Sequence, residues 1–148
     1  MPPRRPLAAD EAPRLAVVVA CSDQRTLPEE IFDVGMGELL VAQTPGPFVD
    51  ESVAATIAFG AHVFEVRLVV VLAHEGCPLF EPPLVLPAST IERQVEHATR
   101  AARADGEPIA HHHARAQAAR VHQLVEDLGP DVLVVPAVLS KSGHVQWC

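Results

Sequence analysis

The sequence predicts a single α/β domain in which a mostly parallel β-sheet is flanked by helices. Two patterns support this prediction. Short apolar runs rich in β-branched residues recur along the chain, as in strands that are buried on both faces of a parallel sheet. These runs alternate with longer segments of helical composition, which is the arrangement of a doubly wound sheet. A length of 148 residues suits one compact domain, so a second full domain is not expected.

The elements follow one another in a regular order. Strands are expected at the apolar runs 15–20, 38–43, 67–73 and 131–139. Helices are expected at 50–63, 89–104 and 111–128. The second helix has a capping residue in Ser89 or Thr90 and an acidic residue, Glu92, in its first turn. The third helix is stopped by Gly129 and Pro130.

Two segments are expected to lie outside these elements. Residues 1–14 are rich in Pro, Arg and acidic residues and have little apolar surface to bury, which predicts a flexible N-terminal arm. Residues 15–148 are then the folded domain. The stretch from Cys77 to Pro87 cannot form a regular helix, because prolines interrupt it, and we expect a rigid loop there. These prolines are Pro78, Pro82, Pro83 and Pro87.

Charge and hydropathy exclude several classes of partner. With 11 basic and 19 acidic residues the formal net charge is −8, which argues against nucleic acid or an anionic membrane surface as the main partner. No apolar run approaches the roughly 20 residues that cross a bilayer. The first residues lack the apolar segment of a secretion signal, so we expect a cytoplasmic protein. Small molecules and other proteins remain as candidate partners.

Metal-ligating side chains directly follow two of the expected strands. Cys21 comes after the first, and His74 with Cys77 comes after the third. The carboxyl ends of parallel strands meet at one edge of a sheet, so these groups are expected to lie together. Two thiolates and one imidazole are three typical zinc ligands and leave the fourth coordination position open. Structural zinc sites usually have four protein ligands, so an open position indicates a catalytic site.

Each of these residues, taken alone, has a simpler interpretation. Cys21 alone would be an ordinary buried cysteine, and His74 alone a hydrogen-bonded histidine. A thiol-redox function is disfavoured because no Cys-x-x-Cys motif is present, and the terminal Cys148 has no assigned role. Asp23 and Arg25 follow Cys21 at alternate positions, so both would project to the same side of an extended segment. Without a metal nearby, such a pair would be a surface ion bridge.

The chain resembles the β-class carbonic anhydrases, whose motifs are Cys-x-Asp-x-Arg after the first strand and His-x-x-Cys after the third. Five residues match these motifs in order, namely Cys21, Asp23, Arg25, His74 and Cys77. Further similar segments are Phe48-Val49-Asp50-Glu51, Phe59-Gly60-Ala61, Gly129-Pro130-Asp131 and Ser142-Gly143-His144-Val145. The similarity extends over about residues 15–147.

The resemblance implies a zinc-dependent lyase that hydrates carbon dioxide reversibly to bicarbonate. Cys21, His74 and Cys77 would bind the zinc, and a zinc-bound hydroxide would attack carbon dioxide. Asp23 would accept a hydrogen bond from the zinc-bound water, and Arg25 would hold that carboxylate in place. The resemblance also implies a homodimer or a higher homo-oligomer.

Some residues differ from the family pattern. Gln43-Thr44-Pro45-Gly46 replaces a basic residue followed by Asn-Ala-Gly, so only Gly46 matches. Pro78 replaces the glycine after the second cysteine and removes a backbone donor. Glu75, between the ligands, could raise the pKa of the zinc-bound water or occupy the fourth position. These differences keep two alternatives open: a zinc hydrolase of carbonyl sulfide or carbon disulfide, and a noncatalytic zinc-stabilised binding or assembly protein.

Three consecutive histidines, His111, His112 and His113, suggest a second metal site. Successive residues of a helix point about 100° apart, so the three rings cannot easily converge on one ion. A solvated helix start is the favoured interpretation. Regulation, transport and proton shuttling by this cluster are weaker hypotheses.

Overall fold

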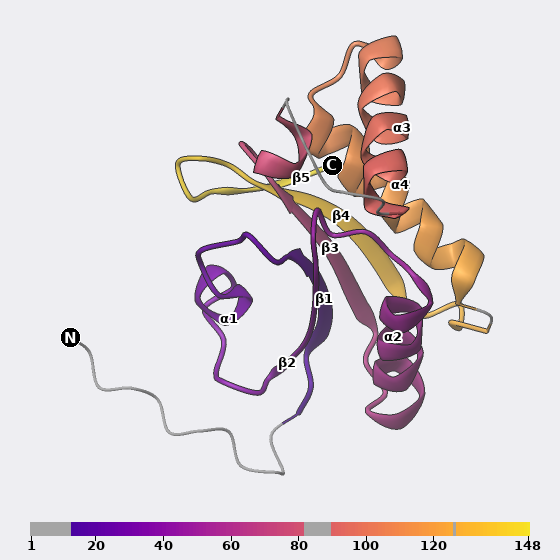
Figure 1. The fold of residues 1–148 in the computed structure, drawn as a ribbon. Coiled ribbons are helices and arrows are strands. Elements are labelled where there is room, and N and C mark those ends of the chain that lie inside the picture. The colour runs from indigo at the N-terminus through magenta and orange to yellow at the C-terminus, as the bar shows by residue number, and fades with distance from the viewer. Residues whose placement is uncertain (1–12, 82–89, 126) are drawn as a thin grey trace.

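A computed structural model describes residues 13–81, 90–125 and 127–148 and contains a five-stranded sheet of order β2-β1-β3-β4-β5. The strands are β1 (Ala16–Cys21), β2 (Leu39–Thr44), β3 (Leu68–His74), β4 (Leu133–Leu139) and β5 (Val145–Trp147). The first four run parallel, and β5 is antiparallel to β4. The helices are α1 (Pro28–Ile31), α2 (Glu51–Val63), α3 (Thr90–Asp105) and α4 (Ile109–Leu124), with a 3₁₀ turn, η1 (Pro78–Phe80). The predicted fold class is confirmed (Figure 1).

The sheet separates two apolar layers, because side chains along a strand alternate between its faces. Val17, Val19, Val69 and Val71 face α2 and α4 in the larger layer. The opposite face packs against α1 and the segment that follows it, through Ile31, Phe32 and Val34. Figure 1 shows this uneven arrangement, with α1 on one side of the sheet and α2 and α4 on the other. Within the described residues the second face is covered less than in a regular doubly wound sheet.

The bounds of one helix and the presence of two short elements differ from the sequence prediction. The helix expected at 111–128 is α4, which begins two residues earlier and ends at Leu124. Val125 and Leu128 are buried in the larger apolar layer although they lie outside the helix, so their apolar character reflects burial in a loop. Neither the four-residue α1 nor the three-residue β5 was predicted, since such short elements have no periodic pattern.

The course of the chain places a crevice between β1 and β3. From β1 the chain crosses to β2 on one side, whereas from β3 it crosses to β4 on the other side. Such a reversal leaves the carboxyl ends of two adjacent strands uncovered, and ligands of open α/β sheets bind there. Cys21 is the last residue of β1 and His74 is the last residue of β3. The fold thus brings the two predicted metal half-sites to the same point.

Helix α2 lies unusually close to the sheet at Gly60. A Cβ atom at this position would lie 2.6 Å from Val17 Cγ2 and 3.0 Å from Leu40 Cδ1. The helix is fixed at its start by the Asp50 carboxylate, which accepts a hydrogen bond of 2.9 Å from the Val53 amide. Val17 is fully buried and β-branched, so its side chain has little freedom to move away from an added Cβ.

Replacing Gly60 by Val should destabilise the protein by about 1–3 kcal/mol, because the added atoms force α2 away from β1. Urea unfolding monitored by circular dichroism measures this change. Ala55→Val is the matched control, since Ala55 is exposed on the same helix and carries the same cost of β-branching. Equal destabilisation by both substitutions would contradict the packing explanation.

Parts of three predictions lie outside the described residues: the arm, the helix cap and the proline loop. Residues 1–12 of the expected arm belong there, as do Ser89 and the loop prolines Pro82, Pro83 and Pro87. Of the expected arm, Arg14 is described: its guanidinium donates to the Gly37 carbonyl and lies 5.6 Å from the centre of the Phe64 ring. No helix in the described parts of the chain is both long and apolar enough to cross a membrane.

Candidate metal centre

Cys21, His74 and Cys77 come together at the carboxyl ends of β1 and β3, and their ligand atoms all lie within 4.8 Å of one another. A tight turn after β3, with Gly76 in the left-handed conformation at φ 68°, returns the chain so that Cys77 faces Cys21. The two sulfurs are 3.8 Å apart, and both cysteines are buried and free of disulfides. Among the described residues these three form the only group with the spacing of a metal site.

This geometry fits a tetrahedral zinc ion. Two sulfurs that each lie about 2.3 Å from such an ion are roughly 3.8 Å apart, which agrees with the observed separation. The Nδ1 atom of His74 donates to the Glu75 carbonyl at 3.2 Å, which leaves Nε2 as the nitrogen available to a metal ion. Nε2 is buried without a hydrogen-bond partner in the described structure. A buried nitrogen with no protein partner is what an imidazole ligand requires.

The protonation of the cysteine pair favours uptake of a cation. The Cys77 thiol donates to the Cys21 sulfur, and this hydrogen bond, opposed by burial, lowers the pKa of Cys21 to about 4. The same bond and burial raise the pKa of Cys77. The Cys21 sulfur also raises the pKa of His74. A divalent cation that bound both sulfurs and the imidazole would displace the protons that these groups carry.

Backbone amides support the Cys21 thiolate from two directions. The Asp23 amide lies 3.4 Å from the Cys21 sulfur, and the Gly46 amide lies 3.3 Å from it. Both donors lower the pKa of Cys21. Gly46 is the one residue of Gln43-Thr44-Pro45-Gly46 that matches the family pattern. It is also the residue of this segment whose amide contacts the Cys21 sulfur.

An open cleft of about 580 Å³ borders the metal centre. His74 lines it together with Asp23, Arg25, Glu81 and Lys141. The Asp23 and Arg25 side chains are exposed, and no ion pair joins them in the described part of the chain. Both residues therefore reach the cleft, but their mutual pairing is not present in this conformation.

Two departures from the family pattern have structural consequences. The Glu75 carboxylate accepts a 2.9 Å hydrogen bond from the Lys141 amide, and the Glu75 amide donates to the Leu139 carbonyl. Glu75 therefore ties the end of β3 to the end of β4, and its carboxylate lies outside the ligand group. Pro78 begins the turn η1, in which the Phe80 amide donates to the Cys77 carbonyl.

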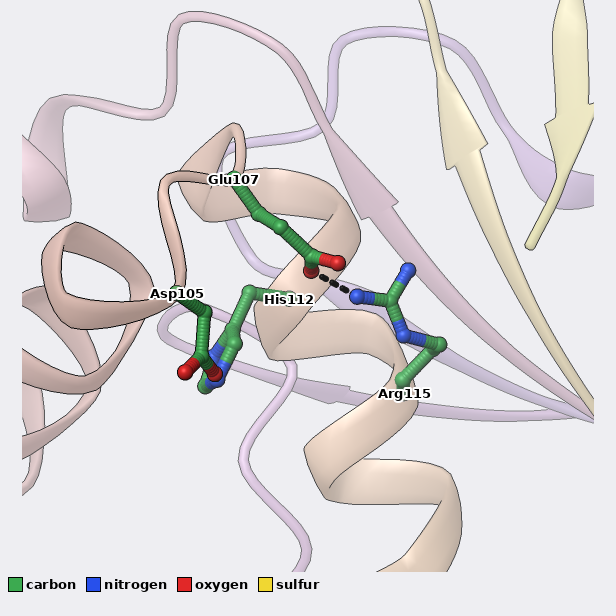
Figure 2. A network of polar contacts seen from close by, with 4 residues as sticks. All are labelled: Asp105, Glu107, His112 and Arg115. Atoms are coloured by element: carbon green, nitrogen blue, oxygen red, sulfur yellow. Dashed lines mark hydrogen bonds and ion pairs between the residues drawn. The ribbon is translucent and has the colours of Figure 1, made fainter.

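The three consecutive histidines point in different directions, and the expectation of a solvated helix start is wrong for His113. His111 Nε2 lies 3.0 Å from Gln146 Oε1 on β5, and His112 Nε2 lies 3.0 Å from an Asp105 carboxylate oxygen. Figure 2 shows the contact of His112 with Asp105 beside a second one between Arg115 and Glu107. Both contacts join α4 to the end of α3 and the turn after it. His113 instead is 0% exposed.

The buried position of His113 and the contact between the Gly46 amide and the Cys21 sulfur were not predicted from the sequence. A signal for His113 was present, because it lies on the buried stripe of α4. The other members of that stripe are Ala110, Ala114, Ala118 and Val121. A histidine at helical spacing among buried small residues indicates a buried polar contact.

Acid should destabilise the protein through His113. Burial chiefly lowers its pKa to about 4, aided by the nearby His112 and opposed by the Gly46 carbonyl and Cys21. In the unfolded chain the same imidazole takes up a proton near pH 6.5. The contribution of neutral His113 to the free energy of unfolding is therefore fully present above about pH 6.5 and is lost as the pH falls toward about 4. The loss attributable to His113 should be on the order of 3 kcal/mol. Urea unfolding of the wild type and of His113→Gln at about pH 7 and 4 measures it. Identical losses in the two proteins would contradict this assignment.

The fold and the Cys21, His74 and Cys77 cluster define an α/β protein with a candidate metal centre beside an open cleft at its strand ends. A family model described as carbonic anhydrase matches residues 16–141. A curated relative, carbonic anhydrase 2 of Mycobacterium tuberculosis, is 40% identical over 74 residues, which cover 50% of this chain and 35% of the relative. The match thus spans about a third of that relative's length. The chain belongs to the β-carbonic anhydrase family.

Solved structures show the same fold at low sequence identity. The β-carbonic anhydrase CafD of Aspergillus fumigatus aligns with a TM-score of 0.77 and 15% identity, covering 94% of this chain and 91% of that one. A tetrameric β-carbonic anhydrase of Sordaria macrospora aligns with a TM-score of 0.75 and 15% identity, covering 92% and 80%. A carbon disulfide hydrolase aligns with a TM-score of 0.63 and 14% identity, covering 91% and 78%.

Proposed function

We propose that this protein binds one zinc ion through Cys21, His74 and Cys77 and hydrates carbon dioxide reversibly to bicarbonate. The observation that supports this most strongly is the buried, unpartnered Nε2 of His74 beside two cysteine sulfurs 3.8 Å apart. A closed structural site would need a fourth protein ligand, and the described residues offer three. Membership of the family supports the same reaction.

The protein side chains have separate tasks in this proposal. When bound, zinc supplies a water that loses its proton near neutral pH and becomes a nucleophile. Asp23, on the wall of the cleft, accepts a hydrogen bond from the attacking oxygen and so orients it. Arg25, on the same wall, orients the Asp23 carboxylate, which requires the two exposed side chains to approach each other. Water and carbon dioxide together yield bicarbonate and one proton.

We further propose that the protein is a homo-oligomer, that it consists of an arm and one domain, and that it is cytoplasmic. A homo-oligomer, either a dimer or a larger assembly, is supported by the tetrameric family member of the same fold. Residues 1–14 would form an arm preceding one zinc domain at 15–148. A location in the cytoplasm is proposed from the sequence alone.

Stopped-flow measurement of carbon dioxide hydration tests the proposed reaction. Protein of measured zinc content should turn over carbon dioxide, and the rate should rise between about pH 6.5 and 9 as the nucleophile loses its proton. Absence of turnover in zinc-loaded protein throughout this range would contradict the proposal. It would favour a noncatalytic binding role, with the altered segment Gln43-Thr44-Pro45-Gly46 and Pro78 as the first residues to test by substitution.

A related zinc hydrolase is the second candidate, because a carbon disulfide hydrolase has the same fold. Carbonyl sulfide and carbon disulfide have a central carbon that the same nucleophile can attack. Assays of hydrogen sulfide release with both compounds, run on the same zinc-loaded protein, separate the two activities. Sulfide release without carbon dioxide hydration would favour the hydrolase.

A further inference from the structure

The histidine of α4 that faces inward, His113, is held in a buried aromatic pocket. Its ring lies edge-on to Phe48, with the ring centres 4.5 Å apart, and 5.0 Å from the ring centre of Phe80. Nε2 lies 2.5 Å from the Gly46 carbonyl oxygen, so it carries the proton and donates to that oxygen. Nδ1 is buried with no hydrogen-bond partner in the described structure. The ring is therefore neutral, as its lowered pKa also indicates.

Gly46 connects this histidine to the metal centre. Its carbonyl accepts from His113, and its own amide donates to the Cys21 sulfur at 3.3 Å. The residue has φ 70°, in the left-handed region that favours glycine, and a Cβ there would collide with Leu79. A glycine with this much conformational freedom does not by itself keep its amide aimed at one atom. The contact with His113 restrains it from the other side.

We propose that His113 is a positioning residue of the metal centre, which holds the Gly46 carbonyl and thereby aims the Gly46 amide at the Cys21 thiolate. Packing between Phe48 and Phe80 does not require a histidine, because an apolar side chain would fill the pocket without burying an unpaired nitrogen. What histidine adds at this position is the hydrogen bond to the Gly46 carbonyl. Backbone donors to a metal-bound cysteine strengthen metal binding by stabilising the thiolate. This inference rests on the proposed metal centre, and it is independent of the substrate.

Cobalt binding tests this inference without any enzymatic assay. Cobalt(II) occupies thiolate and imidazole sites, and its bonds to thiolates give charge-transfer absorption that reports the sulfur environment. His113→Leu fills the pocket but removes the donor, whereas His113→Gln keeps an amide donor of similar reach. His112→Leu is the matched control, because His112 contacts Asp105 instead of Gly46 (Figure 2).

His113→Leu should weaken cobalt binding about 10–100-fold in competition with a chelator and should shift the thiolate-to-cobalt bands. His113→Gln should restore most of the affinity and the spectrum, and His112→Leu should match the wild type. If His113→Leu does not fold, the more adaptable His113→Met takes its place.

Three results would overturn the inference. They are wild-type affinity and spectrum in the folded apolar variant, an equal loss of affinity in His112→Leu, and a folded His113→Gln that fails to recover. A wild-type protein that binds no cobalt would remove the proposed metal centre itself. Wild-type binding that is insensitive to His113 would remove this inference alone.

Discussion

Cys77→Ser is expected to abolish tight zinc binding. Cys77 supplies one of three ligand atoms, and a serine hydroxyl does not ionise at neutral pH, so the ion would keep one thiolate and one imidazole. The affinity should fall by more than the ~10–100-fold that is typical when an outer partner of a ligand is lost. Competition with a coloured chelator, together with elemental analysis of the purified protein, measures this effect.

The third cysteine provides the matched control for this substitution. Cys148 is exposed at the end of the described chain and lies outside the ligand group. Cys148→Ser should therefore bind zinc as tightly as the wild type. Normal zinc content in Cys77→Ser, or zinc loss in Cys148→Ser, would show that the ligand set is different.

Asp23→Asn is expected to lower the rate of carbon dioxide hydration by about 10²–10⁴-fold, the usual contribution of a positioned proton-transfer group. The amide has nearly the same shape as the carboxylate but presents one acceptor oxygen and no negative charge. Zinc content should be unchanged, because the contact of residue 23 with Cys21 comes from its backbone amide. Stopped-flow rates at equal zinc content measure the effect.

Glu81 offers a matched carboxylate on the same cleft. Glu81→Gln removes a negative charge from the cleft but leaves the acceptor at position 23 in place. It should therefore keep the wild-type rate. Equal losses in the two variants would mean that the cleft needs its overall charge and that Asp23 has no special role.

The strands and the ligand cluster were predictable from sequence for a physical reason. A central parallel strand is buried on both faces, so β1 is a continuous apolar run that ends abruptly at a polar segment. Adjacent parallel strands end at one edge, which places Cys21 beside His74 without any knowledge of the segments that connect the two strands. The helix boundaries were less predictable, because Val125 and Leu128 are apolar as buried loop residues.

The support of the ligands was not predictable in the same way. The bond between His113 and Gly46 joins residues 67 positions apart, and it depends on where α4 crosses the loop after β2. The role of Glu75 likewise follows from its tertiary contact with Lys141 and not from its position between two ligands. Sequence spacing identifies groups at strand ends, whereas contacts between helix and loop depend on packing.

Zinc X-ray absorption spectroscopy on the purified protein tests the central claim most directly, because it counts the sulfur and nitrogen or oxygen atoms around the ion. The proposed centre predicts two sulfur neighbours at about 2.3 Å, with one imidazole nitrogen and one further light atom at about 2.0 Å. An anion that binds zinc at the open fourth position through a nitrogen or oxygen atom should change the light-atom shell and leave the sulfur shell unchanged. A shell of three or four sulfurs, or one without sulfur, would contradict a centre formed by Cys21, His74 and Cys77.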